Sequence, residues 1–533
     1  MSVSDGYPQI DWRRLLGPIV SQSGSSASTA IAVDELADLQ QATWNHSRRA
    51  VRPRMDLPTT ELPFDSQAVP WFPRGRFVGS AAVRSEVSSL GTAEISADLA
   101  THLAPRSVSQ LVRPGSFMHY AAGDYYIQDA GSMLALALCA VQPGQWVCDT
   151  CAAPGGKSTG LLEQLGGSGL LVANEVIRSR LALLNLALAR TGYGNQLVFN
   201  SEVEGLARLC GPVFDCVLVD APCTGQTMLA RGKQSLAAFS DHQILHSSAR
   251  QKRILSAAAG LVKPQGRLVY STCAFSYAEN EQIVLDFVQD NPGWRLISQA
   301  GLERWRSPVA EGCYRVWPHR DDCSGAFAAL LCRTDDDVPA VHFNPSVVDE
   351  SPMRQRHPML HGSTSIASSS GWQTLEGLPP AIDWMTSDGS GQCWQRNGEL
   401  HRFAAETPTH WIEAAQSGCE IAQATLGQSA SHSKRPASQS SLRWSPSFGS
   451  AHLTTGVSPS VQPRYRLELN DEQGVRYVAG ETLRIAAQWN NWCLVNWRGR
   501  PLAWGKLSQG VLKNHFPKAL RQSGAIVEAS TGS

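Results

Sequence analysis

The stretch from residue 129 to residue 334 alternates between short apolar runs and longer segments with helical periodicity. Five of the runs are typical of parallel strands buried on both faces: GQWVCDT, GLLVANEV, LVFN, FDCVLVDAPC and RLVYSTC. The segments between them are patterned as helices, and several end at Gly or Pro, as helices commonly do. This alternation predicts an α/β fold with a doubly wound, mostly parallel sheet.

The flanking regions differ from this core. Polar, Ser-rich stretches follow residues 334 and 423, as linkers do. YRLEL, RYVAG and CLVNWRGRPLAWGKL predict strands near the C-terminus. We divide the 533 residues into a mixed, partly disordered tail at 1–47 that contains SQSGSSAST, a small N-terminal domain at 48–128, the α/β domain at 129–334, a linker at 335–370, a short middle unit at 371–423, a Ser-rich linker at 424–463 and a β-rich domain at 464–533.

The composition excludes several classes of protein. The 46 Lys and Arg residues balance 46 Asp and Glu residues, so an RNA contact would need a local basic patch. No apolar run is long enough to span a membrane, and the N-terminal sequence lacks a signal peptide, so we expect a cytoplasmic protein. The odd number of cysteines, 13, does not suggest a disulfide framework. Cys148 and Cys151 form a lone CxxC, and no metal site is predicted.

The sequence DTCAAPGGKSTG, residues 149–160, is close to the phosphate-binding loop of nucleotide hydrolases. That loop needs a glycine where Cys151 stands, and Pro154 has no amide to donate, so an ATPase is disfavoured. The loop nevertheless follows the first strand of the sheet, where doubly wound folds bind cofactors. Glu175, twenty residues after Gly155, has the spacing of a carboxylate that binds ribose hydroxyls. The alternative is that the glycines only end a strand.

Two cysteines follow strands at one edge of the predicted sheet. Cys223, in DAPCTG, comes just after the fourth strand, and Cys273, in STCAF, comes just after the fifth. Because parallel strands end at the same edge, both thiols should face one crevice. A lone cysteine at a strand end is more often a small buried apolar residue. A pair of thiols favours nucleophilic addition to an electron-poor ring.

Four motifs, in this order and spacing, resemble the Nop/Sun family of RNA 5-methylcytosine methyltransferases: DTCAAPGGKST, NEVIRSRL, DAPCTGQTMLARGK and GRLVYSTCAFSYAENEQIV. The resemblance implies a Rossmann-like class I methyltransferase sheet with S-adenosyl-L-methionine as the cofactor. The cofactor contacts that it implies are a loop of Cys151, Ala152, Ala153, Pro154, Gly155, Gly156 and Lys157, ribose binding by Glu175, and an adenine contact by Glu202 with Asn200 as a nearby substitute. It also implies that Asp220 lies between cofactor and base, that Cys273 is the nucleophile, and that Cys223 is the thiol that assists product release.

The chemistry implied by the resemblance follows from the low reactivity of carbon 5 of cytosine. Addition of the Cys273 thiolate to carbon 6 makes carbon 5 nucleophilic, while Asp220 and Lys157 bind the exocyclic amine and the ring nitrogen. Cys223 then assists elimination after the carbon 5 proton is lost. The base must be unstacked to reach the crevice, so we expect a loop or a flipped nucleotide.

The C-terminal segment contains YRLELNDEQGVRYVAG followed by VNWRGRPLAWGKLSQGVLKNHFPKALR. With these sequences it resembles the PUA-like region of the bacterial 16S rRNA methyltransferase F group. The resemblance implies RNA of the small ribosomal subunit as the substrate, an RNA-binding N-terminal domain and a monomer. A basic and aromatic surface is predicted from Lys506, Lys513, His515, Lys518, Arg521, Trp497, Trp504 and Phe516, although we favour a core position for the two tryptophans. The alternatives are a tRNA cytosine-5 methyltransferase and a non-catalytic ribosome-assembly factor of the same fold.

Overall fold

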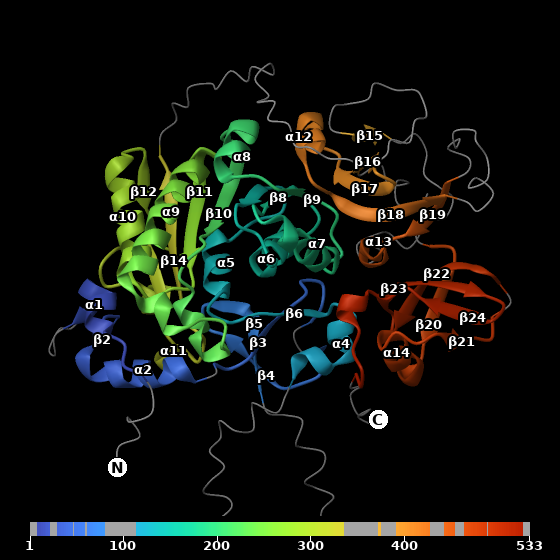
Figure 1. Cartoon of the computed structure of the whole chain (residues 1–533), viewed down its shortest axis with the longest axis horizontal. Coiled ribbons are helices and arrows are strands. Elements are labelled where there is room, and N and C mark those ends of the chain that lie inside the picture. Colours follow the sequence, from blue (N-terminus) through green and yellow to red (C-terminus); the bar gives the residue numbers. More distant parts are fainter. Residues whose placement is uncertain are drawn as a thin grey trace, which may run out of the picture.

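The computed structural model describes residues 8–21, 29–45, 47–58, 61–79, 113–334, 371–374, 391–426, 442–453, 463–487 and 489–525. In these residues the chain forms an eight-stranded central sheet and four smaller sheets (Figure 1). None of the helices in the described ranges combines the length and apolar character needed to cross a membrane.

The central sheet has the strand order β12-β14-β11-β10-β7-β8-β9, and β13 pairs with β14. Strands β7 to β11 are parallel, whereas β14 is antiparallel to its three neighbours. The strands are β7 (Trp146–Asp149), β8 (Leu170–Asn174), β9 (Gln196–Phe199), β10 (Phe214–Asp220), β11 (Val262–Thr272), β12 (Trp294–Leu296), β13 (Cys313–Val316) and β14 (Ala326–Arg333). The predicted doubly wound sheet is confirmed. Its strand order reverses between β7 and β10, which places a ligand crevice at their carboxyl ends.

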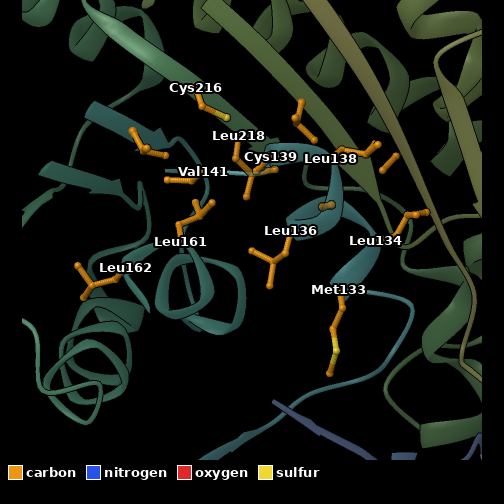
Figure 2. Packing of buried hydrophobic residues seen from close by; sticks show 14 of the residues in the cluster. Met133, Leu134, Leu136, Leu138, Cys139, Val141, Leu161, Leu162, Cys216 and Leu218 are labelled. Atoms are coloured by element: carbon orange, nitrogen blue, oxygen red, sulfur yellow. The ribbon is translucent and has the colours of Figure 1, made fainter. Parts of the chain in front are cut away.

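Helices cover both faces of this sheet. One face carries α5 (Met133–Cys139), α6 (Gly156–Leu165) and α7 (Leu181–Ala189), and the other carries α8 (Val203–Cys210), α9 (Asp241–Ala259) and α10 (Glu281–Asp290). Along β10, Cys216 and Leu218 join the first core and Val217 and Val219 join the second. Figure 2 shows the first core, where Leu136 and Leu161 lie near Leu218. Burial on both faces explains the unbroken apolar runs of the strands.

Residues 8–21 and 29–45 are part of the folded molecule, which differs from the mixed, partly disordered tail predicted at 1–47. They form α1 (Trp12–Leu16), β1 (Val20–Ser21), β2 (Ile31–Ala32) and α2 (Leu36–Trp44). Trp12, Leu15 and Leu16 are buried on one face of α1. The Trp12 ring meets Phe239 and Phe275 edge-on, with ring centroids 6.2 and 5.4 Å apart. Most of SQSGSSAST lies outside the described residues.

A four-stranded sheet, ordered β4-β5-β3-β6, occupies the predicted segment 48–128. Its strands are β3 (Ala50–Pro53), β4 (Ser66–Val69), β5 (Phe72–Val78) and β6 (Tyr125–Ile127), and α4 (Met118–Ala121) precedes β6. The sheet packs beside the central domain: Trp71 donates to the carbonyl of Ala130 at 2.9 Å and contacts Trp305 edge-on. It therefore borders the carboxyl edge of the central sheet.

The middle unit extends further than its predicted limits of 371–423. Its sheet comprises β15 (Gln373–Thr374), β16 (Gly391–Arg396), β17 (Glu399–Ala404), β18 (Cys419–Leu426) and β19 (Leu442–Pro446), with α12 (Thr409–Ala414) and α13 (Phe448–Leu453). The linker predicted at 424–463 thus contains β19 and α13. Pairing with β18 supplies the hydrogen bonds that this short strand within a serine-rich stretch lacks alone. A bridge between Val198 and Ser417 fixes this unit to edge strand β9.

The C-terminal domain is a five-stranded sheet, ordered β20-β22-β23-β24-β21, with one helix. Its elements are β20 (Arg466–Leu469), α14 (Asp471–Val478), β21 (Leu483–Arg484), β22 (Asn491–Trp497), β23 (Arg500–Ser508) and β24 (Val511–Asn514). RYVAG, predicted as a strand, is the end of α14. The side chains of Asn470 and Gln473 form a reciprocal capping box that starts this helix.

Candidate active site

The carboxyl edge of the central sheet gathers the predicted site residues. The loop 151–157 follows β7, Glu175 follows β8, Asp220 ends β10, and Cys273 follows β11. A cavity of about 60 Å³ lies here, and Lys157 and Cys273 are among its lining residues. The remaining lining comes mainly from residues around Asp129, Thr227 and 324–327. Parallel strand direction explains why residues more than a hundred positions apart meet at one edge.

The two predicted thiols lie next to each other. The Sγ atoms of Cys223 and Cys273 are 3.2 Å apart, and both side chains are half-buried. The hydrogen bond with Cys223 lowers the pKa of Cys273 and outweighs burial and the Asp220 carboxylate, which raise it; the Lys157 ammonium lowers it by a smaller amount. The same hydrogen bond and burial raise the pKa of Cys223. Cys273 is thus the more acidic thiol of the pair.

Lys157 and Asp220 form an ion pair beside these thiols. Lys157 Nζ lies 2.6 Å from Asp220 Oδ2, and the Ser271 hydroxyl donates to Asp220 Oδ1 at 2.9 Å. Burial lowers the pKa of Lys157, but the Asp220 carboxylate outweighs it, and the net shift is upward. Lys157 therefore remains a cation, and its charge is already balanced by a carboxylate of the chain.

The loop 151–157 is held from below by buried polar groups. The Ser158 hydroxyl donates to Asp149 Oδ2 at 2.6 Å, and burial raises the pKa of Asp149 to about 7. Gly155 has a φ of +109°, and a Cβ added there would lie 2.8 Å from that of Ala187. Only glycine accepts both this conformation and this contact. The loop therefore lies directly on α7.

Glu175 and Glu202 have different surroundings. Glu175 is 3% exposed; its carboxylate accepts from the amide of Ile177 at 2.8 Å and pairs with Arg180 at 3.0 Å. Glu202 is exposed and pairs with Arg253 of α9 at 3.3 Å. The side chain of Asn200, the predicted substitute, donates to the carbonyl oxygen of Glu175 at 2.6 Å. Asn200, and not Glu202, is therefore the residue that hydrogen-bonds to the turn at Glu175.

Sequence reasoning missed the buried polar residues that shape the two cysteine loops. Glu279, fully buried, accepts from the Thr224 amide at 2.9 Å and from its hydroxyl at 2.6 Å, which fixes the loop after Cys223. Gln226 accepts from the amides of Phe275 and Ser276 at 2.7 and 3.0 Å. Glu279 lies within the motif SYAENEQIV, so its identity was visible in the sequence, but its partner on another loop was not.

Arg52 is a second missed residue. It is 1% exposed, and its guanidinium bonds Glu163, Gln128, Thr159 and the carbonyl of Gly156 at the start of α6. One side chain of the N-terminal sheet thus supports the loop 151–157. Such a fork of donors satisfies several buried acceptors at once.

Replacing Arg52 with methionine is expected to destabilise the protein by about 3–5 kcal/mol, because Glu163 is left as a buried, unpaired charge. Urea unfolding measures this change. Arg76→Met, on the neighbouring β5, is the matched control, because Arg76 bonds only Ser66 and pairs with no carboxylate in the described residues. Adding Glu163→Leu to Arg52→Met should recover part of the loss. A cost of less than about 1 kcal/mol for Arg52→Met would contradict this account.

Two family models match the chain. The model of the 16S rRNA methyltransferase RsmB/F matches residues 135–332, and that of the methyltransferase RsmF PUA domain matches residues 464–522. Residues 135–332 are thus similar to the RsmB/F methyltransferases. The chain is an RNA methyltransferase, and the matched stretch includes Lys157, Glu175, Asp220, Cys223 and Cys273. The resemblance found in the sequence motifs is thereby confirmed.

Curated relatives that the chain resembles carry the name ribosomal RNA small subunit methyltransferase F. One, from Klebsiella pneumoniae (strain 342), is 28% identical over 425 residues, which cover 77% of this chain and 81% of the relative. Another, from Salmonella arizonae, is 29% identical over 430 residues with the same coverage. Among solved structures, a methyltransferase homolog protein from Pyrococcus horikoshii is 24% identical, with a TM-score of 0.44 over 56% of this chain and 91% of that one.

In the region that matches the PUA domain model, the residues of the predicted surface fall into two groups. Trp497, Trp504 and Phe516 are buried at 0%, 3% and 2% exposure and belong to the interior. The basic residues are exposed: Lys506, Lys513, His515, Lys518 and Arg521. The half-buried Trp492 lies among them, with the His515 ring 4.5 Å away and the Lys506 ammonium 5.7 Å from its centroid. Sequence reasoning missed Trp492, which immediately precedes the predicted strand that begins at Cys493.

Proposed function

We propose that this protein transfers a methyl group from S-adenosyl-L-methionine to carbon 5 of a cytosine in 16S rRNA, through a covalent adduct of Cys273. The observation that carries the proposal is the pair of thiols, Cys223 and Cys273, 3.2 Å apart beside the Lys157–Asp220 ion pair. In the proposed reaction one thiol forms the adduct with the base, and the other assists the resolution of that adduct.

The residues around the loop 151–157 fit a cationic cofactor better than a phosphate. Three carboxyl groups gather at this edge, those of Asp149, Glu175 and Asp220, and the cations Lys157 and Arg180 are already paired with two of them. A phosphate would meet repulsion there, whereas a sulfonium and an ammonium group would not. Glu175 retains acceptor capacity for ribose hydroxyls, because an ionised carboxylate accepts about four hydrogen bonds. When bound, S-adenosyl-L-methionine supplies the methyl group as an electrophile.

The residues of the chain then activate and release the base. The Cys273 thiolate attacks carbon 6 of the cytosine, and the electron pair of the carbon 5–carbon 6 bond becomes available at carbon 5. Asp220 and Lys157 stabilise the charge that develops on the ring nitrogen and the exocyclic amine. After methylation, water accepts the carbon 5 proton, the electron pair of the carbon–hydrogen bond restores the carbon 5–carbon 6 double bond, and Cys273 leaves as a thiolate. Cys223, within hydrogen-bond distance of that sulfur, stabilises the leaving thiolate by a hydrogen bond.

Small-subunit ribosomal RNA is the proposed substrate because curated relatives are named for that activity and because the PUA domain exposes a basic surface around Trp492. Stacking on an aromatic ring flanked by cations suits unpaired bases. The test is transfer of labelled methyl groups to naked 16S rRNA, small ribosomal subunits and tRNA, with identification of the labelled nucleoside. The proposal expects 5-methylcytidine in rRNA. Label in tRNA alone would mean that tRNA, and not rRNA, is the substrate. No label in any RNA would favour the assembly-factor alternative.

The pH dependence of adduct formation is expected to follow the Cys273 thiol. Because the bond from Cys223 lowers the pKa of Cys273, its thiolate forms at a pH below the usual thiol value of about 8.5. The rate of adduct formation should therefore rise with pH up to that lowered pKa and then level off. Cys223→Ala removes the donor and should move the rise to higher pH, whereas Cys223→Ser, which keeps a donor, should move it less. Rapid-quench single-turnover experiments measure the rate; an unmoved profile in Cys223→Ala would contradict the assignment.

A further inference from the structure

A second cavity lies between the N-terminal residues and the α/β domain. Its volume is about 340 Å³, within the range of roughly 300–1,000 Å³ that small-molecule sites occupy. Cys223 and Cys273 are not among the residues that line it. Its lining comes from the region of Thr29 and Glu35 and from residues 304–321, and it includes four arginines: Arg304, Arg306, Arg315 and Arg320. An arginine-rich lining points to an anionic ligand.

Two of these arginines are already neutralised. Arg315 is 3% exposed, and its Nε donates to Glu281 at 2.7 Å. The Arg320 guanidinium forms a two-point contact with Glu35, with distances of 3.0 and 2.5 Å. Both ion pairs are neutral overall and form part of the cavity wall. The net charge of the cavity is therefore set by the other lining residues.

The other two arginines are exposed and free to bind. Arg304 lies over the ring of Trp305, 5.6 Å from its centroid, and neither Arg304 nor Arg306 forms an ion pair with a carboxylate in the described ranges. Asp321 is the remaining acidic residue of the lining; it accepts from Trp305 Nε1 at 3.0 Å and from the Trp317 amide at 2.8 Å, and its charge offsets one of the two cations. Because Arg304 and Arg306 outnumber it, the lining keeps a net positive charge.

The cavity lies at the same edge of the sheet as the nucleophile. Strand β14 is antiparallel to both β11 and β13, so β11 and β13 run in the same direction and end at one edge. Trp317, the residue after β13, lines the cavity and stacks on Phe275, with ring centroids 6.2 Å apart and planes 3° apart. Phe275 is two residues beyond Cys273. A ligand in the cavity would thus lie beside the loop that carries the nucleophile.

We propose that this cavity binds a backbone phosphate of the RNA strand that carries the target cytosine, through Arg304 and Arg306. The proposal rests on the RNA substrate of the proposed function. The chain as a whole has no net charge, so RNA affinity depends on local clusters of this kind. Figure 1 places α2 and α11 (Pro318–Asp321), beside the cavity, on the opposite side of the α/β domain from the PUA domain. The two basic regions therefore lie on either side of the central domain.

The test is the salt dependence of binding of the full chain to a 16S rRNA transcript. The double variant Arg304→Gln/Arg306→Gln removes the two charges, and Arg208→Gln/Arg295→Gln is the matched control. Arg208 of α8 and Arg295 of β12 are also exposed, and Figure 1 places both elements at the end of the sheet away from α2 and α11. Filter binding across a salt series gives both the affinity and the slope of log K against log salt.

The double variant is expected to bind RNA about tenfold more weakly. Its slope should be shallower by about 0.7 for each phosphate that the variant no longer neutralises, while the control binds as wild type. RNA binding by the double variant equal to that of wild type would overturn the proposal. Inorganic phosphate that raises the melting temperature of wild type but not of the variant, with RNA binding unchanged, would make this a free-phosphate site and also overturn it. Wild-type protein that binds RNA but transfers no methyl group would refute the proposed function while the cavity result still stood.

Discussion

Cys273→Ala is expected to reduce methyl transfer to RNA by on the order of 10⁴-fold or more, the scale of loss when an enzyme loses its covalent nucleophile. Without the thiolate, carbon 5 of cytosine has no route to become nucleophilic, and neither Lys157 nor Asp220 can supply one. Cofactor binding should be unaffected, because the loop 151–157 and Glu175 are held by their own contacts. Labelled methyl transfer and cofactor titration measure the two properties separately.

The control for this change is Cys332→Ala. Cys332 is also a half-buried thiol, but it lies near the end of β14 opposite Arg267, away from the carboxyl edge of β11. Its removal should leave the rate within about twofold of wild type, since it touches no group used in the reaction. A Cys273→Ala protein that retained a tenth or more of wild-type turnover would contradict the role assigned to Cys273.

Cys223→Ala is expected to lower turnover by at least about 100-fold and to accumulate protein linked covalently to RNA. Adduct formation needs only Cys273, but its resolution loses the neighbouring thiol that is 3.2 Å away in the structure. A denaturing gel should show a band shifted by the RNA, dependent on the cofactor and removed by ribonuclease.

The double variant Cys223→Ala/Cys273→Ala provides the control for trapping and should give no shifted band. The roles of the two cysteines are exchanged if Cys273→Ala traps RNA and Cys223→Ala does not. Absence of any trapped complex, with full turnover by Cys223→Ala, would remove Cys223 from the mechanism.

The sequence was sufficient to predict the central sheet and the meeting of Asp220, Cys223 and Cys273, because parallel strands end at one edge whatever the details of packing. It also predicted Lys157 and Glu175 at that edge. It did not predict that Lys157 pairs with Asp220, or that the thiols of Cys223 and Cys273 share a hydrogen bond. Those interactions depend on side-chain directions that spacing along the chain does not determine.

The errors have physical causes. RYVAG has the residues of a strand, but Asn470 and Gln473 cap a helix that includes most of it. The stretch 424–463 is rich in serine, yet β19 pairs along β18, and such pairing outweighs weak local propensity. The tail at 1–47 contains an apolar face centred on Trp12, whose partners, Phe239 and Phe275, are distant in sequence. Arg52 and Glu279 were missed for the same reason.

Bisulfite mapping of 16S rRNA is the most direct test of the central claim. RNA would be compared from cells with the gene, cells without it, and deleted cells that carry either wild type or Cys273→Ala. The account predicts a defined 5-methylcytosine that disappears on deletion, returns with wild type and does not return with Cys273→Ala. Unchanged methylation of 16S rRNA in the deleted cells, or full restoration by Cys273→Ala, would contradict it.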